Sequence, residues 1–242
     1  MASYKKYEDI LKIELVSHST SPAPEKYGKD LKELITFCAR VSNPSNQSNM
    51  DTADKLIKYL LKHKHFSPFE MVNVCLEITS TRDIIRQILR HRSFTFQEFS
   101  QRYADPVQEL DFCIRECRFQ DTKNRQNSIS INAALQNDQD YFERNRISSI
   151  FYNLQHEHIQ KCKEDYSFLV SHGVAKEQAR AILPEGNTIS RCYMSGTLRS
   201  WLHYIEVREK NGTQKEHMMI ARECAKVISK LFPPIIDLQE NI

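Results

Sequence analysis

The segment from Arg90 to Tyr103 gathers the side chains of this chain that are best suited to do chemistry. It reads Arg-His-Arg-Ser-Phe-Thr-Phe-Gln-Glu-Phe-Ser-Gln-Arg-Tyr, so three arginines, a histidine, a glutamate and serine hydroxyls occur within fourteen residues. Arginine presents its N–H donors in a flat fork that matches phosphate and carboxylate groups. The segment therefore predicts a compact pocket for an anionic, planar ligand.

Two kinds of element must position these groups. An apolar helical stripe, formed by Ile84, Ile85, Ile88 and Leu89, predicts a helix over residues 82–92. On that helix Gln87, Arg90 and His91 are spaced i, i+3 and i+4, so they share one face. Further along, Glu98, Ser100 and Arg102 occupy every second position, and an extended chain would place them on one side.

The rest of the chain predicts one α+β domain over residues 1–242. We expect a modest, mostly antiparallel sheet with several packed helices and one long helix in the middle of the chain. The predicted strands cover 10–16, 69–79, 111–119 and 188–195; the predicted helices cover 31–41, 51–63, 138–172, 175–183, 198–208 and 216–231. Residues 121–137 are polar and are expected on the surface. Five aromatic residues are interpreted as the packing side of the long helix: Tyr141, Phe142, Phe151, Tyr152 and Tyr166.

Composition limits the classes of function. With 34 basic and 31 acidic residues the net charge is only +3, so we expect no nucleic-acid partner. Residues 1–11 lack the apolar core of a signal peptide, and no apolar run could span a membrane. Seven cysteines without a CxxC pair indicate no metal site and a reducing, cytoplasmic or otherwise intracellular location. The five glycines form no GxGxxG or Walker A loop, so arginines and helix ends must hold any phosphate.

The arginine-rich segment resembles the defining motif of the flavin-dependent thymidylate synthases, which is Arg-His-Arg, seven residues, then Ser. Here the motif runs from Arg90 to Ser100, and it continues into the family's Glu-x-Ser-x-Arg-Tyr at residues 98–103. The resemblance extends from His65 to about Glu216, and it implies the fold and the activity of that family.

Further pieces match the same family. Residues 65–70 (His-Phe-Ser-Pro-Phe-Glu) are similar to an element near the flavin, although Met71 stands where the family commonly has histidine. Residues 179–184 (Ala-Arg-Ala-Ile-Leu-Pro) resemble the segment whose arginine contacts the nucleotide. Residues 197–203 resemble Asn-x-Arg-Ser-Leu-x-Asn, with Thr197 and His203 in place of asparagines. Taken alone, His65 would be an ordinary loop histidine and Arg180 an ordinary helix-end arginine.

The resemblance implies reductive methylation of dUMP to dTMP. It implies FAD as the cofactor, with methylenetetrahydrofolate and NADPH as cosubstrates. The cofactor-binding residues would be His65, Ser67, Arg90, His91, Arg92, Glu98, Thr197, Arg199 and His203. The substrate-binding residues would be Gln87, Arg90, Glu98, Ser100, Arg102, Arg180 and Arg208. Arg208 is also the predicted catalytic residue, because a positive group beside N3 favours the ionised pyrimidine.

Several consequences and alternatives accompany this hypothesis. Ser100 is not expected to be a nucleophile, since a serine needs an adjacent base, and no cysteine has the Pro-Cys-His setting of the classical thymidylate synthase. The family implies a homotetramer with shared active sites. One alternative is a diverged flavin-dependent NADPH oxidoreductase without methylation activity. Another is a nucleic-acid-binding module built on a basic helix with Arg82, Arg86, Arg90 and Arg92.

Overall fold

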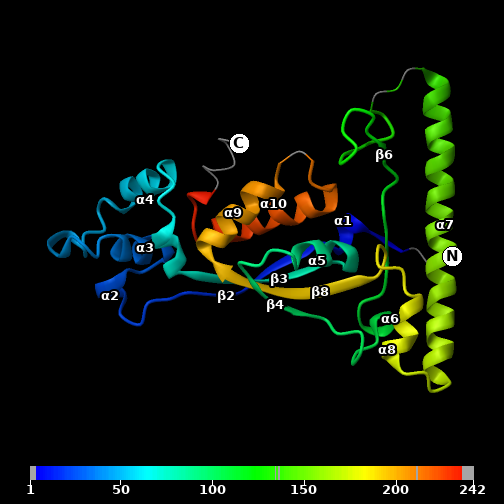
Figure 1. Cartoon of the computed structure of the whole chain (residues 1–242), viewed down its shortest axis with the longest axis horizontal. Coiled ribbons are helices and arrows are strands. Elements are labelled where there is room, and N and C mark those ends of the chain that lie inside the picture. Colours follow the sequence, from blue (N-terminus) through cyan, green and yellow to red (C-terminus); the bar gives the residue numbers. More distant parts are fainter. Residues whose placement is uncertain (1–3, 134, 136, 211, 236–242) are drawn as a thin grey trace.

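A four-stranded antiparallel sheet forms the centre of the molecule (Figure 1). The structure is a computed structural model that describes residues 4–133, 135, 137–210 and 212–235. The strand order is β2-β3-β8-β4, and each neighbouring pair is antiparallel. The strands are β2 (Lys12–His18), β3 (Asn73–Thr81), β4 (Thr95–Glu98) and β8 (Ile189–Thr197). The predicted α+β class with a mostly antiparallel sheet is confirmed.

The apolar residues of β3 face a layer of helices. Val74, Leu76 and Ile78 are fully buried, whereas the alternating Cys75 and Glu77 are only half-buried. This period of two is the pattern of a strand with one face on the core. The helices packed against the buried face are α5 (Arg82–Ile88), α9 (Leu198–Arg208) and α10 (Lys215–Ser229). On α9, the Trp201 indole N–H donates to the Val74 carbonyl at 3.0 Å, so the largest core side chain also has its polar atom satisfied.

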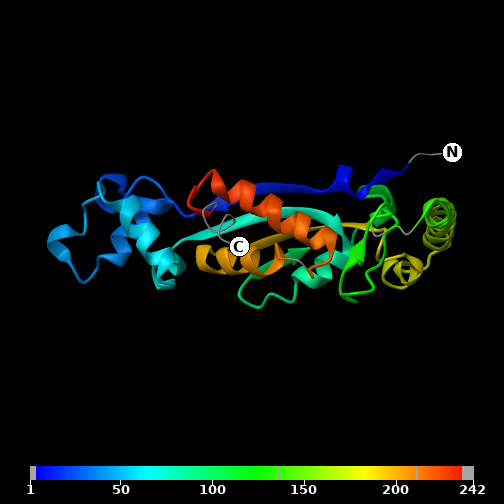
Figure 2. The same cartoon turned by 90° about the horizontal axis from the view of Figure 1, so that it is seen from above.

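Short helices form one end of the molecule (Figures 1 and 2). They are α2 (Pro24–Tyr27), α3 (Leu31–Ala39), η1 (Pro44–Asn46), α4 (Ala53–Lys62) and η2 (Ser67–Met71). Helix α3 begins at Asp30, whose carboxylate accepts from the backbone N–H of Glu33 at 2.8 Å, an N-cap contact. The helices predicted over 31–41 and 51–63 are present; the first is two residues shorter than predicted and the second is three residues shorter.

A long helix stands at the opposite end of the sheet (Figures 1 and 2). This helix, α7 (Asp138–Ser171), begins at the N-cap Asn137 and ends before Gly173, which has φ +85° and allows the left-handed turn. The smaller elements near it are β1 (Lys5–Lys6), α1 (Tyr7–Ile10), α6 (Pro106–Glu109), β5 (Cys113–Ile114), β6 (Phe119–Gln120), β7 (Ser128–Ile129), α8 (Lys176–Ala179) and η3 (Arg180–Ile182). None of the helices within the described residues is long and apolar enough to cross a membrane.

The strand predicted over 111–119 is not continuous. Phe112 forms an antiparallel bridge with Thr188 and Cys113–Ile114 pairs in parallel with Lys5–Lys6, whereas Phe119–Gln120 belongs to a separate hairpin with β7. The reason is that Gln155 on α7 takes the backbone groups of Arg115. Its Oε1 accepts from the Arg115 N–H at 2.8 Å and its Nε2 donates to the Arg115 carbonyl at 3.0 Å, so no strand partner is needed.

Two predicted strands begin later than expected. The strand predicted over 10–16, which is β2, begins at Lys12, because Tyr7–Ile10 forms the helical turn α1. Strand β3 begins at Asn73 instead of residue 69, because Pro68 lies at the start of the 3-10 helix η2. Proline lacks the N–H that a ladder requires and suits a helix start.

The interpretation of the aromatic residues on the long helix is wrong for four of the five. Tyr166 is fully buried, but Tyr141, Phe142, Phe151 and Tyr152 are exposed. The buried residues of α7 are instead Gln155, Ile159, Cys162 and Tyr166, which recur at helical spacing along one stripe. The buried residues described for α7 therefore form one narrow stripe in its second half, whereas in its first half Arg144 donates to the carbonyls of Ile131 and Ala133.

Candidate functional site

The arginine-rich segment leaves its helix earlier than the sequence predicts. Helix α5 ends at Ile88, and residues 89–94 form turns in which His91 N–H donates to the Ile88 carbonyl at 3.0 Å. Phe94 is buried with its ring 4.8 Å from that of Trp201, which draws the chain toward β8. The predicted helix over 82–92 is therefore four residues too long. Arg90 and His91 lie in a turn and do not share a helical face with Gln87.

The extended segment is also shorter than predicted. Strand β4 pairs with β8 only as far as Glu98, and Ser100 begins a turn in which its carbonyl accepts from Tyr103 N–H at 3.2 Å and Ala104 N–H at 3.0 Å. The expectation that Glu98, Ser100 and Arg102 line one side of a strand is thus wrong. A turn stops the period-two alternation after the first of the three.

Arg208 and His91 meet at the C-terminal end of α9. Arg208 Nε donates to His91 Nε2 at 2.9 Å, and the His91 ring lies edge-on to Tyr204 with centroids 4.9 Å apart. Burial, the Arg208 charge and nearby His203 lower the pKa of His91 to about 4. Neutral His91 accepts at Nε2, so its other ring nitrogen carries the proton.

Gln87 is held by two residues that the sequence analysis did not single out. Its Nε2 donates to Gln214 Oε1 at 2.8 Å, and its Oε1 lies 3.3 Å from His217 Nδ1. His217 is fully buried, and its Nε2 lies 3.1 Å from the Tyr204 hydroxyl. Gln214 and His217 have no motif of their own, so only the fold could bring them to Gln87 from 127 and 130 positions away.

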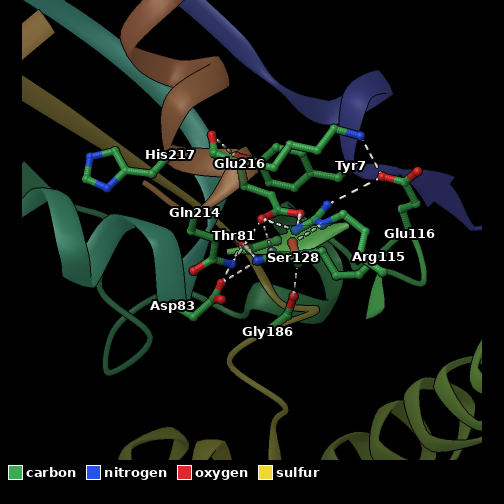
Figure 3. A network of polar contacts seen from close by, with 12 residues as sticks. Tyr7, Thr81, Asp83, Arg115, Glu116, Ser128, Gly186, Gln214, Glu216 and His217 are labelled. Carbon is green, nitrogen blue, oxygen red and sulfur yellow. Dashed lines mark hydrogen bonds and ion pairs between the residues drawn. The ribbon is translucent and has the colours of Figure 1, made fainter. Parts of the chain in front are cut away.

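An ion-pair network continues from Gln214 into the molecule (Figure 3). Gln214 Nε2 donates to Glu216 at 3.0 Å, and Glu216 is paired with Arg118 at 2.7 Å and Arg115 at 3.4 Å. Arg115 also pairs with Asp83 at 2.6 Å. Burial would raise the pKa of Glu216, but the charges of Arg115 and Arg118 outweigh it and hold that pKa below its usual value.

A basic pocket of about 260 Å³ lies where α5 meets the loop after α8. It is lined by Arg82, Arg86, Gln101, Glu177, Arg180, Ala181, Leu183, Glu185 and Thr188. Glu185 pairs with Arg86 at 2.6 Å and with Arg82 at 3.6 Å. Arg82 also reaches Glu98 at 3.3 Å, and Arg102 pairs with Glu177 at 3.2 Å.

The pocket contains a buried donor that the sequence analysis missed. Gln101 is 3% exposed, and its Nε2 has no hydrogen-bond partner within the described part of the chain. A buried amide without a partner costs free energy unless a ligand or water satisfies it. Together with Arg180, Arg82 and Arg86 it makes this pocket suited to an anionic, oxygen-rich ligand.

A larger cavity of about 760 Å³ lies at the start of α9. It is lined by Leu61, Lys64, Phe66, Glu70, Ser93, Thr197, Arg199, Ser200, Leu202, His203 and Glu206, which include three predicted cofactor residues. Thr197 is the N-cap of α9 and accepts from the Ser200 N–H at 3.3 Å. Arg199 forms an ion pair with Glu70. The size is typical of a cofactor site, and the mixture of apolar and polar groups suits a flat ring system.

The remaining predicted residues lie on the surface of the single chain. His65 and Ser67 are exposed on either side of Phe66, which lines the larger cavity. Arg90 and Arg92 are exposed as well, in the turn after α5. The predicted site residues therefore lie in separate places. Some line the larger cavity, some belong to the His91–Arg208 cluster or the basic pocket, and Arg90 and Arg92 are exposed in the turn after α5.

Comparisons with known proteins find similar sequences over most of the chain. A family model described as thymidylate synthase complementing protein matches residues 25–234. The chain is 45% identical over 204 residues to a probable flavin-dependent thymidylate synthase of Paramecium bursaria Chlorella virus 1, covering 84% of this chain and 88% of that protein. It is also 45% identical over 202 residues to a flavin-dependent thymidylate synthase of Synechocystis sp., covering 84% and 86%.

A solved structure shares the fold. The UMP/dUMP methylase PolB from Streptomyces cacaoi, bound with 5-Br dUMP, superimposes with a TM-score of 0.71 at 23% identity, covering 96% of this chain and 95% of that one. At this identity the likeness shows the architecture and not the individual contacts.

Proposed function

Because the chain belongs to the flavin-dependent thymidylate synthase family, we propose that it methylates dUMP to dTMP with FAD as cofactor. We propose methylenetetrahydrofolate as the one-carbon donor and NADPH as the source of electrons. The observation that carries the proposal is the contact between Arg208 and His91, two residues that both match the family's motifs. They are 117 positions apart in the sequence, yet Arg208 Nε lies 2.9 Å from His91 Nε2. The His91 ring also lies near that of His217, which contacts Gln87.

The basic pocket is proposed to hold part of the dUMP. Arg180 and Arg102 would bind the phosphate dianion by charge-assisted hydrogen bonds, with Glu98 and Ser100 beside them. Glu177 pairs with Arg102, and Glu185 pairs with Arg86 and Arg82. The proposed pocket gains support from the unpartnered Gln101 amide, which a nucleotide oxygen would satisfy.

Arg208 is proposed as the catalytic residue. A guanidinium beside N3 of the pyrimidine favours the ionised ring, which is the more reactive form. His91 accepts a hydrogen bond from Arg208 and so fixes the direction of the guanidinium. Because the pKa of His91 is lowered to about 4 by burial, Arg208 and His203, the imidazole stays neutral near pH 7 and does not compete for the substrate's charge.

The larger cavity is proposed to take part of the FAD. Thr197, Arg199 and His203 line it, and Glu70 and Ser93 add polar groups at its wall. Thr197 and His203 are able to hydrogen-bond in place of the family's asparagines. When bound, FAD would supply the hydride that completes the methyl group. The protein residues would then orient the ring system and keep water away from it.

No protein nucleophile is proposed. The Ser100 hydroxyl lies 3.4 Å from the backbone N–H of Arg102, and within the described residues it contacts no histidine or carboxylate. Burial raises the pKa of all seven cysteines, to about 12 for Cys113 and Cys192. A thiol in that state is a poor nucleophile.

We propose that the enzyme is a homotetramer whose active sites combine residues of several chains. In one chain the predicted cofactor residues do not converge, because Arg90 and Arg92 are exposed in a turn while Arg199 lines a separate cavity. The exposed aromatic residues of α7 give the chain an apolar surface of the kind that subunit contacts cover.

The nucleic-acid alternative is disfavoured by the ion pairs of the basic helix. Arg82 and Arg86 are both paired with Glu185, and Arg90 and Arg92 lie beyond the end of α5. The four arginines therefore do not form a continuous row for tracking phosphates.

The test is dTMP formation by purified protein supplied with dUMP, methylenetetrahydrofolate, NADPH and FAD. Enzyme stripped of FAD and assayed without it serves as the control. FAD-dependent dTMP formation is the expected result. Oxidation of NADPH without dTMP would replace the proposal with the diverged oxidoreductase. Absence of both activities in a folded, colourless protein would contradict the flavin site itself.

A further inference from the structure

A chain of hydrogen bonds runs from the buried carboxylate of Glu216 through Gln87 to Tyr204. Glu216 accepts from Gln214 Nε2 at 3.0 Å, and Gln214 Oε1 accepts from Gln87 Nε2 at 2.8 Å. Gln87 Oε1 lies 3.3 Å from His217 Nδ1, and His217 Nε2 lies 3.1 Å from the Tyr204 hydroxyl. Figure 3 shows the Glu216 end of this series of hydrogen bonds, with Gln214 and Arg115 beside it.

The direction of the chain is fixed at Glu216. This residue is 3% exposed and is paired with Arg118 at 2.7 Å and Arg115 at 3.4 Å, so its carboxylate is ionised and can only accept. Gln214 must therefore turn its NH2 group toward Glu216 and its oxygen toward Gln87. The amide of Gln87 must in turn offer its own NH2 to Gln214, which leaves its oxygen toward His217.

His217 and Tyr204, at the opposite end of the hydrogen-bonded series, accept either orientation of the Gln87 amide. Burial, Arg208 and His91 lower the pKa of His217 to about 3, so its ring carries one proton and can place it on Nδ1 or Nε2. The Tyr204 hydroxyl can donate or accept by rotation. Neither residue selects an orientation for the Gln87 amide. Among the groups of this hydrogen-bonded series, the Glu216 carboxylate alone selects one.

We propose that Gln214 and Glu216 are positioning residues that fix the donor and acceptor ends of the Gln87 amide, and that this orientation makes the site select a uracil over a cytosine nucleotide. The inference rests on the proposed function, because it takes Gln87 as a contact to the base. Each end of the amide still has one hydrogen-bonding position to offer, an N–H on Nε2 and a lone pair on Oε1.

The chemistry of the two bases explains the selection. The two bases differ at position 4 of the ring, where uracil presents an acceptor, O4, and cytosine presents a donor, the N4 amino group; N3 is left to Arg208, which favours its ionised form. The N–H that remains on Nε2 of the fixed amide therefore matches O4 of uracil and opposes the amino group of cytosine. An amide free to turn by 180° about its terminal bond would match both, because its oxygen and nitrogen exchange places.

The experiment compares the binding of dUMP and dCMP to FAD-loaded protein by calorimetry, with Gln214→Leu as the principal variant. Gln214 is half-buried at the start of α10, and leucine leaves the Glu216–arginine pairs intact. We expect the wild-type protein to prefer dUMP, and the ratio of dissociation constants to fall on the order of tenfold in the variant. The matched control is Lys215→Gln, whose side chain contacts Glu116 and Glu8 and lies outside the chain of hydrogen bonds.

Glu216→Gln is a second test, because a neutral amide at this position no longer fixes the orientation of the Gln214 and Gln87 amides. Circular dichroism checks that each variant is folded. A ratio that stays at the wild-type value in a folded Gln214→Leu protein would overturn the positioning role while leaving the proposed function intact. A folded wild-type protein that binds neither nucleotide would overturn the proposed function and this inference together. A fall in the ratio with Lys215→Gln equal to that of Gln214→Leu would show a general loosening and also overturn it.

Discussion

Single residues set the chemistry of the His91–Arg208 cluster. Arg208 donates to His91 at 2.9 Å and its charge helps to lower the pKa of His91. We predict that Arg208→Ala lowers kcat/KM for dUMP by at least about 100-fold, the usual cost of removing one preorganised charge-stabilising donor. The variant should also raise the pKa of His91 above about 4, which an NMR titration of the imidazole would follow. Near wild-type kinetics would refute the catalytic role.

Ser100 provides the opposite test at the same scale. Its hydroxyl lacks a base in the described residues, so we predict that Ser100→Ala reduces turnover by less than about 100-fold, as for loss of one ligand hydrogen bond. Removal of a true nucleophile costs about a millionfold in enzymes that use one. Steady-state dTMP assays distinguish the two cases. Complete loss of activity with intact dUMP binding would contradict the prediction.

The two buried histidines predict how stability depends on pH. Burial and neighbouring cations lower the pKa of His91 to about 4 and of His217 to about 3, from an ordinary value of 6.5. The unfolded chain therefore binds more protons than the folded chain below pH 6.5. The contribution of these histidines to stability is complete above pH 6.5, is lost as the pH falls below 6.5, and stops changing once the pH is below about 4 for His91 and about 3 for His217. Each such proton contributes at most about 1.4 kcal/mol per pH unit.

The measurement is the urea midpoint between pH 7 and pH 4. We predict that His217→Phe makes its pH dependence shallower by about one proton. His158→Gln, at an exposed position of α7, is the matched control and should leave the slope unchanged. Equal slopes for all three proteins would show that His217 is protonated without unfolding.

At the scale of elements, the junction of β4 with β8 depends on a glycine. A Cβ at Gly196 would lie 2.5 Å from Cδ1 of Phe94, whose ring packs 4.8 Å from that of Trp201. We predict that Gly196→Ala destabilises the fold by about 1–3 kcal/mol through overpacking. Chemical denaturation would measure this. Gly186→Ala is the control, because nothing lies within 4 Å of its Cβ position, and it should change stability by less than about 0.5 kcal/mol. Equal stability of the two variants would refute the packing argument.

Elements also explain which sequence predictions fail. Long periodic helices such as α7 and α9 match their predicted ranges closely, since their own caps and hydrogen bonds define them. The helix predicted over 82–92 ends early because Phe94 is drawn into the core beside Trp201. The strand predicted over 111–119 is interrupted at Arg115, whose backbone groups bind Gln155, a residue 40 positions away. Local periodicity carries no information about such distant partners.

At the scale of the whole molecule, the exposed side of α7 bears on assembly. Phe142 is 72% exposed and Phe168 is 60% exposed. If the proposed tetramer buries this surface, Phe168→Glu should shift the species seen by light scattering toward one chain and lower activity, because a charge would be desolvated in the contact. Glu157→Gln, which is exposed on the same helix, is the control. An active wild-type protein with the mass of one chain would contradict the tetramer.

The sequence by itself determined the family, the α+β class and the identity of the arginine-rich segment. These follow from residue type and short-range spacing, which are complete in the sequence. The tertiary structure decided where the polar groups lie. It brought Arg208 into contact with His91, and it brought Gln214 and His217 into contact with Gln87 where α5 packs against α10. Hydrogen-bond partners more than 100 positions apart are set by how helices pack on a sheet, and packing depends on the whole chain.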